Sequence, residues 1–151
     1  MADNRLHLLQ RGNKGNSPNA VMQWDLKPVL RSLIRERALP DVEPAAVREM
    51  DLGDIKGVPL CFTDASPLPQ GGWLFSAVAE NTGGAYEDGP CLGSAIGRVD
   101  VRSRVRWVKL APAQWKIEGI DAQITGAKLH AWLVTDADDV AVPACLLRWG
   151  A

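Results

Sequence analysis

An internal repeat of short apolar stretches constrains the fold of this chain more than any other feature of its sequence. Residues 62–65 and 72–81 are echoed in pattern by residues 117–120 and 127–136, at a spacing of about 50 residues. Further stretches share the pattern: 95–100 with 145–150, and 47–52 with 105–110, while 6–11 and 20–25 supply a third copy. Four-stranded units that recur at such a period are typical of the blades of a β-propeller.

Turn-forming residues separate the apolar stretches, as expected for a mainly β protein. Clusters of Gly, Pro, Asn and Asp bound short runs of apolar residues, and residues 13–18 and 83–90 are expected to form loops. We predict strands at residues 6–10, 20–24, 47–52, 60–65, 73–79, 94–99, 105–110, 119–124, 128–135 and 144–149.

One segment has the period of a helix instead. Its apolar residues are Leu26, Val29, Leu30, Leu33 and Ile34, and Asp25 precedes them as a candidate N-cap. Basic residues occupy the remaining face, which we expect to be solvated. Because Pro40 disfavours helical backbone at Leu39, we predict an amphipathic helix over residues 26–37.

The repeat predicts an incomplete propeller of about two and a half four-stranded blades. At 151 residues the chain is long enough for one domain. We expect a partial blade over 5–52 with the helix inserted, a full blade over 58–110 and a partial blade over 115–151. A blade buries its faces against neighbouring blades, and open strand edges invite pairing with another chain. We therefore expect a homo-oligomer, or completion by a missing N-terminal half.

Charge and cysteine content limit the partners and the compartment. With 17 basic and 18 acidic residues, the net charge of −1 argues against a nucleic-acid partner, which usually requires a basic excess. No apolar run resembles a signal peptide or a membrane span, so a cytoplasmic protein is expected. Cys61, Cys91 and Cys145 are odd in number and widely spaced, and we expect buried free thiols.

A family resemblance extends over nearly the whole chain. It rests on residues 8–13, 62–65, 73–82, 86–91, 96–97, 116–120 and 133–139. In these stretches the sequence resembles an uncharacterised family of bacterial propeller-like proteins. Members of that family are longer, so the chain resembles their C-terminal half. The resemblance implies a propeller-like fold and brings no established activity.

Acidic residues near strand ends are the candidates for a metal site. Glu118 precedes Gly119 at the start of a predicted innermost strand, and Asp64 lies close to the equivalent place in the preceding unit. An acidic residue before glycine at a channel mouth is similar to the metal-binding glutamate of calcium-dependent propeller hydrolases. Carboxylates are the ligands that calcium prefers. Glu118, Asp64 and Asp136 are therefore candidate ligands of a divalent cation, although acidic residues at strand ends are also common turn formers.

A small-molecule site is the second candidate at the same mouth. Arg11 ends a predicted second strand, and its guanidinium could clamp a carboxylate or phosphate, or could pair with Glu80 and Asp136. The candidate ligand-binding residues are Arg11, Asp64, Glu80, Asn81, Glu118 and Asp136, with Asp138 and Asp139 as further sources of oxygen.

No complete catalytic motif is present in the sequence. Ser94 directly follows Gly93, which excludes the G-x-S-x-G nucleophile elbow, and with only His7 and His130 a catalytic triad has few ways to form. The sequence therefore favours an uncharacterised propeller-like scaffold or ligand-binding module. The alternative is a metal-dependent hydrolase of an ester, lactone or phosphate at the channel mouth, with the cation activating water.

Overall fold

The computed structural model describes residues 4–12, 17–36, 43–81, 89–126 and 128–150, and within these ranges the chain is mainly β-strand with one helix. The elements in chain order are β1 (Arg5–Gln10), β2 (Asn19–Asp25), α1 (Leu26–Glu36), β3 (Ala46–Met50), β4 (Asp54–Ile55), β5 (Val58–Pro59), β6 (Cys61–Pro67), β7 (Trp73–Glu80), β8 (Cys91–Val99), β9 (Val105–Leu110), β10 (Ile117–Thr125), β11 (Lys128–Thr135) and β12 (Leu146–Gly150).

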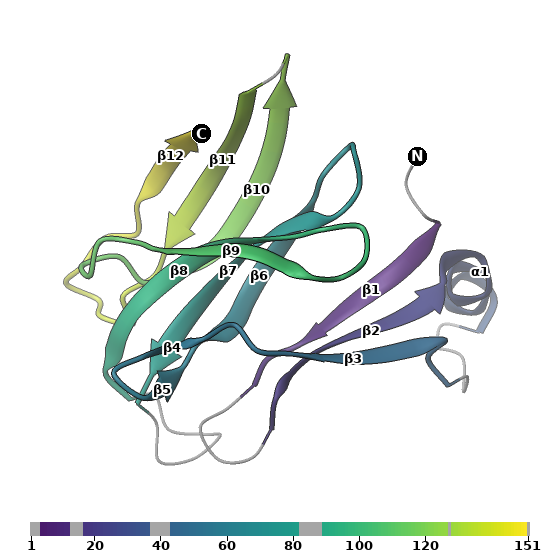
Figure 1. Ribbon diagram of the computed structural model, residues 1–151, viewed down its shortest axis with the longest axis horizontal. Helices are drawn as coiled ribbons and strands as arrows, with labels where there is room; N and C mark the ends of the chain where they lie inside the picture. The colour runs from purple at the N-terminus through teal and green to yellow at the C-terminus, as the bar shows by residue number, and fades with distance from the viewer. Residues whose placement is uncertain (1–3, 13–16, 37–42, 82–88, 127, 151) are drawn as a thin grey trace.

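The strands form three larger antiparallel sheets and one small hairpin. The first sheet has the order β1-β2-β3, the middle sheet β6-β7-β8-β9 and the third sheet β10-β11-β12, while β4 and β5 pair with each other. Figure 1 shows the three larger sheets arranged as a fan, with the middle sheet between the other two. No sheet closes on itself among the described residues. The mainly β fold expected from the sequence is confirmed.

The middle sheet is buried on both faces, which explains the apolar run of β7. One face, with Phe75 and Ala77, joins a core cluster that includes Val21 of the first sheet. The other face, with Leu74 and Ile96, joins a second cluster with residues of the third sheet. A strand covered on both sides reads as a continuous apolar segment rather than as an alternating one, because neither face meets water.

A close approach within the middle sheet requires glycine at position 97. Gly97 pairs with Phe75 on the neighbouring strand, and a Cβ at Gly97 would lie 2.2 Å from Cζ of the Phe75 ring. The ring itself packs edge-on against Phe62, with 5.3 Å between the ring centroids. Gly97 therefore leaves the space in which the buried aromatic side chains of this sheet pack.

Each predicted strand corresponds to a strand of the structure, and the bounds at Val105–Leu110 and Lys128–Thr135 are as expected. The β4–β5 hairpin was not predicted. Lys56 and Gly57 form its turn with φ angles of 53° and 79°, and Asp54 Oδ1 accepts the Gly57 N–H at 2.7 Å. Residues 13–16 and 83–88 of the predicted loops lie outside the described residues.

Helix α1 follows β2 directly, as the helical period predicted. The backbone N–H of Leu26 donates to the carbonyl of Asn4 at 3.0 Å, which satisfies one donor of the first turn. Val29 is buried, whereas Leu33 and Ile34 are exposed, so the apolar stripe is only partly covered. The predicted end at Arg37 and Leu39-Pro40 lies outside the described residues. Within the described ranges, no helix is both long and apolar enough to cross a membrane.

A β-bulge recurs at the same point of the middle and third sheets. The pairing of β6 with β7 shifts register between Phe62 and Asp64, and that of β10 with β11 shifts between Ile117 and Gly119. A bulge is a built-in feature that bends a strand and redirects its side chains. The two bulges therefore fix which residues of the two sheets are structurally equivalent.

The bulges correct one part of the sequence alignment. After the bulge, Asp64 pairs with Ser76 and Gly119 pairs with Val134, so Ser76 and Val134 hold equivalent positions. The repeat pattern had set Ser76 against Ala131 instead. The alignment slipped by three positions because the β10–β11 hairpin is the longer of the two: 15 positions separate Gly119 from Val134, whereas 12 separate Asp64 from Ser76.

Candidate functional site

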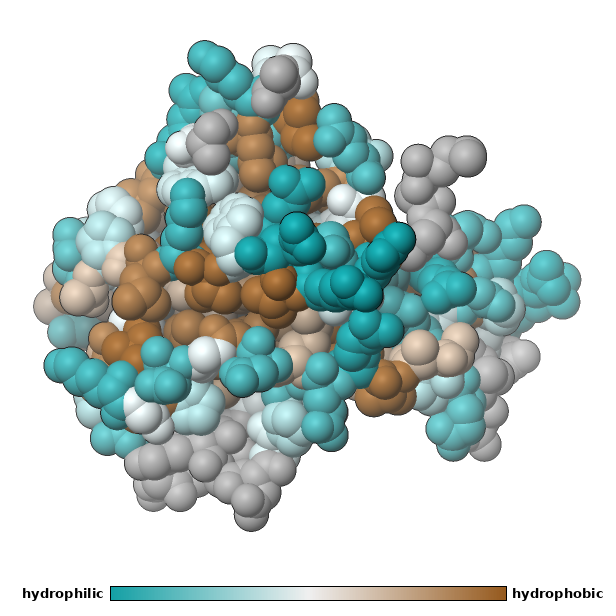
Figure 2. Space-filling view, in the orientation of Figure 1, coloured by the Kyte–Doolittle hydropathy of each residue, from teal (hydrophilic) through white to brown (hydrophobic). Residues whose placement is uncertain are grey.

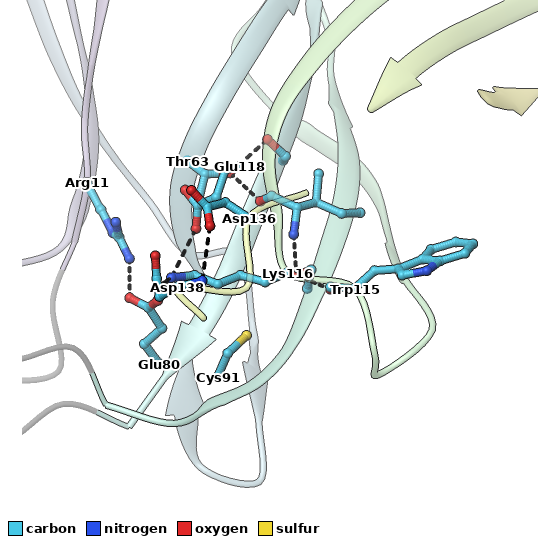
Figure 3. A network of polar contacts seen from close by, with 12 residues as sticks. Arg11, Thr63, Glu80, Cys91, Trp115, Lys116, Glu118, Asp136 and Asp138 are labelled. Atoms are coloured by element: carbon cyan, nitrogen blue, oxygen red, sulfur yellow. Dashed lines mark hydrogen bonds and ion pairs between the residues drawn. The ribbon is translucent and has the colours of Figure 1, made fainter. Parts of the chain in front are cut away.

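The ammonium group of Lys116 lies at the centre of a cluster of acidic side chains. Its Nζ is 2.6 Å from Glu80 Oε1 and 3.5 Å from Glu118 Oε1, and it also forms an ion pair and hydrogen bond with Asp138 Oδ2. Arg11 pairs with the other oxygen of Glu80. Figure 3 shows these side chains converging from different elements. We call Arg11, Glu80, Lys116, Glu118 and Asp138 the Lys116 network.

The Lys116 network joins the ends of all three sheets. Arg11 follows β1, Glu80 ends β7, and Lys116 directly precedes β10. Glu118 is the residue at the bulge of β10, which turns its side chain toward the cluster. Asp138 lies in the turn after β11. Charged groups that the sequence separates by more than a hundred residues thus meet at one place (Figure 3).

The turn after β11 is held to Lys116 by its backbone as well as by its side chain. The N–H of Asp136 donates to the carbonyl of Lys116 at 3.0 Å. The Asp136 carboxylate in turn accepts the N–H of Asp138 at 3.0 Å, and Asp138 adopts a positive φ of 54°. Asp136 therefore acts as a turn former that positions Asp138, the role typical of an Asp at a strand end.

The centre of the Lys116 network is buried and its rim is open to solvent. The side chains of Glu80 and Lys116 are only 8% and 10% exposed, whereas those of Arg11 and Asp138 are 47% and 46% exposed. An ion pair shielded in this way is screened by salt much less than one at the surface. The Glu80–Lys116 pair is therefore the electrostatic core of the cluster.

Burial and charge shift two titrations in the cluster. Burial alone would lower the pKa of Lys116, but the close contacts of its ammonium with the Asp138 and Glu80 carboxylates and the negative charges of Glu80 and Glu118 outweigh it and raise that pKa. Burial raises the pKa of Glu118, and the positive charges of Lys116 and Arg11 only partly oppose that shift. Lys116 is thus held as an ammonium, while Glu118 ionises less readily than an exposed glutamate.

Two carboxylate oxygens of the cluster can each accept a further hydrogen bond. Glu80 Oε1 and Glu118 Oε1 are buried, and neither receives a hydrogen bond of acceptable geometry from the residues that the structure describes. Both lie within ion-pair distance of Lys116 Nζ, so their charge is compensated although their lone pairs are not aligned with a donor. A buried acceptor without an aligned donor costs free energy, and a hydrogen-bond donor from outside the chain would relieve that cost.

The structure brings only some of the predicted site residues together. Arg11, Glu80 and Glu118 belong to the Lys116 network, and Asp136 supports its rim. Asp64 lies elsewhere, at the seam between β6 and β10, where its Oδ2 accepts the Ile120 N–H at 2.9 Å and its Oδ1 accepts the Ala65 N–H at 2.8 Å. The Asn81 backbone N–H donates to the Pro90 carbonyl at 3.1 Å.

Side chains of the middle sheet cap the backbone edge of β10. Ser66 Oγ accepts the Ala122 N–H at 2.9 Å, and Ser94 Oγ accepts the Ile117 N–H at 2.9 Å. Together with Asp64, these groups give donors of an edge strand the partners that another strand would otherwise supply. Ser94 also donates to the Trp115 carbonyl at 2.8 Å, so it is part of the seam between the sheets.

The Asn19 side chain likewise hydrogen-bonds backbone groups where the first and middle sheets meet. Its Oδ1 accepts the N–H groups of Gly12 and Phe62, both at 3.0 Å, and its Nδ2 donates to the Leu60 carbonyl at 2.8 Å. The side chain is buried. The backbone groups that it satisfies belong to segments on both sides of the seam, so Asn19 fixes the first sheet against β6.

The cysteines do not pair with one another in the structure. Cys61 is buried, Cys91 is half-buried and Cys145 is exposed, and all three are free thiols. The expectation of burial therefore holds fully for Cys61 alone. Burial raises the pKa of Cys61 and of Cys91, which keeps both thiols protonated. Cys91 lies beside the Lys116 network (Figure 3).

The residues present do not fit a calcium site. Among the described residues, no group of three or more His, Cys, Asp or Glu side chains is placed to hold a metal ion. Calcium takes six to eight oxygen ligands as a rule. Two of the proposed ligands, Asp64 and Asp136, are used by backbone N–H groups, and the ammonium of Lys116 occupies the centre of the acidic cluster beside Glu118.

Lys116 was not among the site residues predicted from the sequence. Alternation along a strand puts residues i and i+2 on one face, which could have linked Lys116 with Glu118. No sequence signal links either residue with Glu80, because that contact depends on how two sheets pack.

The fold and the site together define a mainly β protein of antiparallel meander sheets whose ends are joined by a buried, lysine-centred ionic cluster. Residues 1–140 match the model of a family of unknown function, DUF6910, and the chain belongs to this family. No curated protein and no solved structure matches the chain.

Proposed function

We propose that the protein is a propeller-like binding scaffold whose ligand site is the Lys116 network. The observation that carries the proposal is the convergence of charged side chains from all three sheets around two buried carboxylate oxygens that lack aligned donors. Mouths of radial β architectures are common ligand sites, because chain ends and loops from several sheets meet there.

The propeller-like arrangement is supported by three features of the sheets. Each larger sheet is a meander of neighbouring strands in chain order, and the middle one has four strands. The first strands of the middle and third sheets, β6 and β10, lie side by side and carry the same bulge. Their seam is filled by side chains rather than by ladder hydrogen bonds, as between the blades of a propeller.

The chemistry of the ligand follows from the two carboxylate oxygens to which no described residue donates a well-aligned hydrogen bond. Glu80 Oε1 and Glu118 Oε1 carry negative charge and can accept hydrogen bonds from a ligand. A small polar molecule that donates from hydroxyl or ammonium groups would satisfy them, while the exposed guanidinium of Arg11 could bind a carboxylate on the same molecule. An apolar ligand would leave the two buried oxygens without donors and is disfavoured.

Thermal unfolding tests this proposal with defined probes. The wild-type protein is melted with and without glycerol, glucose, ethanolamine, glycine and glutamate, each titrated to saturation. At a ligand concentration of about 100 times Kd, binding stabilises the native state by about 2.7 kcal/mol. We expect a saturable rise in Tm with at least one probe, lost in Glu118→Gln and kept in Glu43→Gln, an exposed control. The absence of any saturable shift contradicts the proposal.

The same assay distinguishes the hydrolase alternative. Calcium, magnesium and manganese are added in turn to the wild type and to Glu118→Gln. Because Lys116 already compensates the acidic cluster, we expect none of the three cations to raise Tm through Glu118. A metal-dependent rise that disappears in Glu118→Gln would support a metal-dependent hydrolase of an ester, lactone or phosphate in place of the scaffold.

A further inference from the structure

The outer face of the third sheet carries a row of apolar side chains that the described part of the chain leaves exposed. On this face Val134 pairs with Leu146, and Trp132 pairs with Arg148. Trp132, Val134 and Leu146 are 38%, 46% and 67% exposed. The opposite face of the same sheet packs against the middle sheet through buried residues such as Leu133. The exposed row is therefore the free side of a sheet whose other side is already part of the core.

The bulges identify what this face corresponds to in the middle sheet. Counted from the bulge, Trp132 is equivalent to Leu74, Val134 to Ser76, and Leu146 to Ile96, as the paired positions show. In the middle sheet these three residues are 0%, 0% and 3% exposed, because they face the third sheet. The exposed face of the third sheet is thus equivalent to the face of the middle sheet that the third sheet covers.

The first sheet presents a free face at the other end of the fan. Leu8, Met22 and Val47 form one row across its three strands. Leu8 and Val47 are 49% and 58% exposed. The opposite face packs on the middle sheet through Val21. Among the residues that the structure describes, an exposed apolar row therefore lies on the outermost sheet at each end of the three-sheet fan in Figure 1.

The two free faces also differ in charge. Arg148 is exposed on the outer face of the third sheet, with its guanidinium 6.0 Å from the ring centre of Trp132. Glu49 is exposed on the outer face of the first sheet, two positions from Val47 along β3. Lys128 and Asp121 are exposed on the same third-sheet face, which with Arg148 has two basic residues and one acidic residue and is net basic. A contact between the two faces therefore joins net opposite charges, whereas a contact of either face with its own copy joins net like charges. Charge thus favours a head-to-tail arrangement.

We propose that the outer face of the third sheet docks onto the outer face of the first sheet of a second copy, and that the reciprocal contact closes a two-fold ring. This inference rests on the propeller-like arrangement proposed above. Three larger sheets in each copy give six in the pair, within the range of about four to eight blades in propellers. A head-to-tail interface forms a closed ring only when its rotation closes, and here two copies suffice.

Size-exclusion chromatography with light scattering tests the ring. We expect the wild type to elute as a dimer, with twice the 16.4 kDa mass of one chain. Val134→Glu and Val47→Glu should each weaken association at least about 100-fold, because each replaces an apolar contact residue with a carboxylate that must lose its water in the contact. Val101→Glu makes the same change at an exposed turn of the middle sheet and should remain dimeric.

Mixing the two interface variants gives the sharpest result. A copy with Val134→Glu keeps an intact first-sheet face, and a copy with Val47→Glu keeps an intact third-sheet face. One of the two contacts can therefore form, and we expect dimers in the mixture although neither variant dimerises alone. Leu146→Glu, at the most exposed position of the row, replaces Val134→Glu if circular dichroism shows the latter to be unfolded.

The outcomes separate the ring from its rivals. A monomeric wild type overturns the inference, as does an assembly larger than a dimer, which indicates an open chain of contacts. A dimer broken by Val134→Glu but not by Val47→Glu overturns it too, since that pattern indicates a third-sheet face pairing with itself. A monomer that still shows a ligand-induced rise in Tm dependent on Glu118 overturns the ring while leaving the proposed binding function intact.

Discussion

Lys116 Nζ lies 2.6 Å from Glu80 Oε1, although the two residues belong to different sheets. The pair is nearly buried, and Arg11 of the first sheet pairs with the other oxygen of Glu80. One carboxylate therefore links the ends of three sheets. The other contacts described above each join two neighbouring sheets, so at this pair a change in one residue affects all three.

Removal of the Lys116 ammonium should destabilise the fold. Lys116→Met keeps the apolar length of the side chain but leaves Glu80 buried and compensated only by Arg11. We expect a loss of about 3 kcal/mol in the free energy of unfolding, measured by urea denaturation. Lys128→Met, at an exposed position of the third sheet, should cost less than about 0.5 kcal/mol. Equal losses in the two variants would show that the buried pair has no special role.

The raised pKa of Glu118 predicts an effect in weakly acidic solution. Burial makes the folded state hold the proton of Glu118 more tightly than the unfolded chain, in which a glutamate titrates near about 4.3. The stabilisation is therefore complete below that pH and is lost as the pH rises through the folded pKa. Glu118→Gln lacks this loss, so its free energy of unfolding relative to wild type should rise as the pH increases above about 4.3. A difference that is constant with pH, measured by urea denaturation, would contradict the assignment.

Asn19 should be costly to replace because three backbone groups depend on its side chain. Asn19→Ala removes the partners of the Gly12 and Phe62 N–H groups and of the Leu60 carbonyl. We expect a loss of about 3 kcal/mol by urea denaturation, since groups left buried and unsatisfied cost more than a hydrogen bond contributes. Gln123→Ala, which truncates an exposed amide, should stay within about 0.5 kcal/mol of wild type. A small loss in Asn19→Ala would mean that water replaces the amide.

The strands were predictable because local signals specify them. Apolar runs bounded by Gly, Pro, Asn and Asp located each strand of the larger sheets, and the helical period located α1. The β4–β5 hairpin escaped prediction because its turn residues are Lys56 and Gly57, whereas Asn-Gly and Asp-Gly are the strong signals for such turns. The backbone there still needs positive φ at both positions, and the hydrogen bond that the Gly57 N–H donates to the Asp54 carboxylate helps to hold it.

The site was predictable only in part, because its contacts depend on tertiary packing. Arg11, Glu80 and Glu118 were identified from their places at strand ends, and the possible pairing of Arg11 with Glu80 was foreseen. The role of Lys116 was not, since it arises from the packing of β10 against the end of β7. Asp64 was expected at a metal site, yet it caps a backbone N–H, a role that sequence does not distinguish from metal binding.

A double-mutant cycle between Glu80 and Lys116 tests the central claim most directly. The free energies of unfolding of wild type, Glu80→Gln, Lys116→Met and the double variant give the coupling energy between the two side chains. Because the two side chains form a buried pair, we expect the double variant to lose less free energy of unfolding than the sum of the two single losses. The expected difference, which is the coupling energy, is about 2 kcal/mol. Additive losses would show that the two residues act independently and would contradict the Lys116 network as the junction of the sheets.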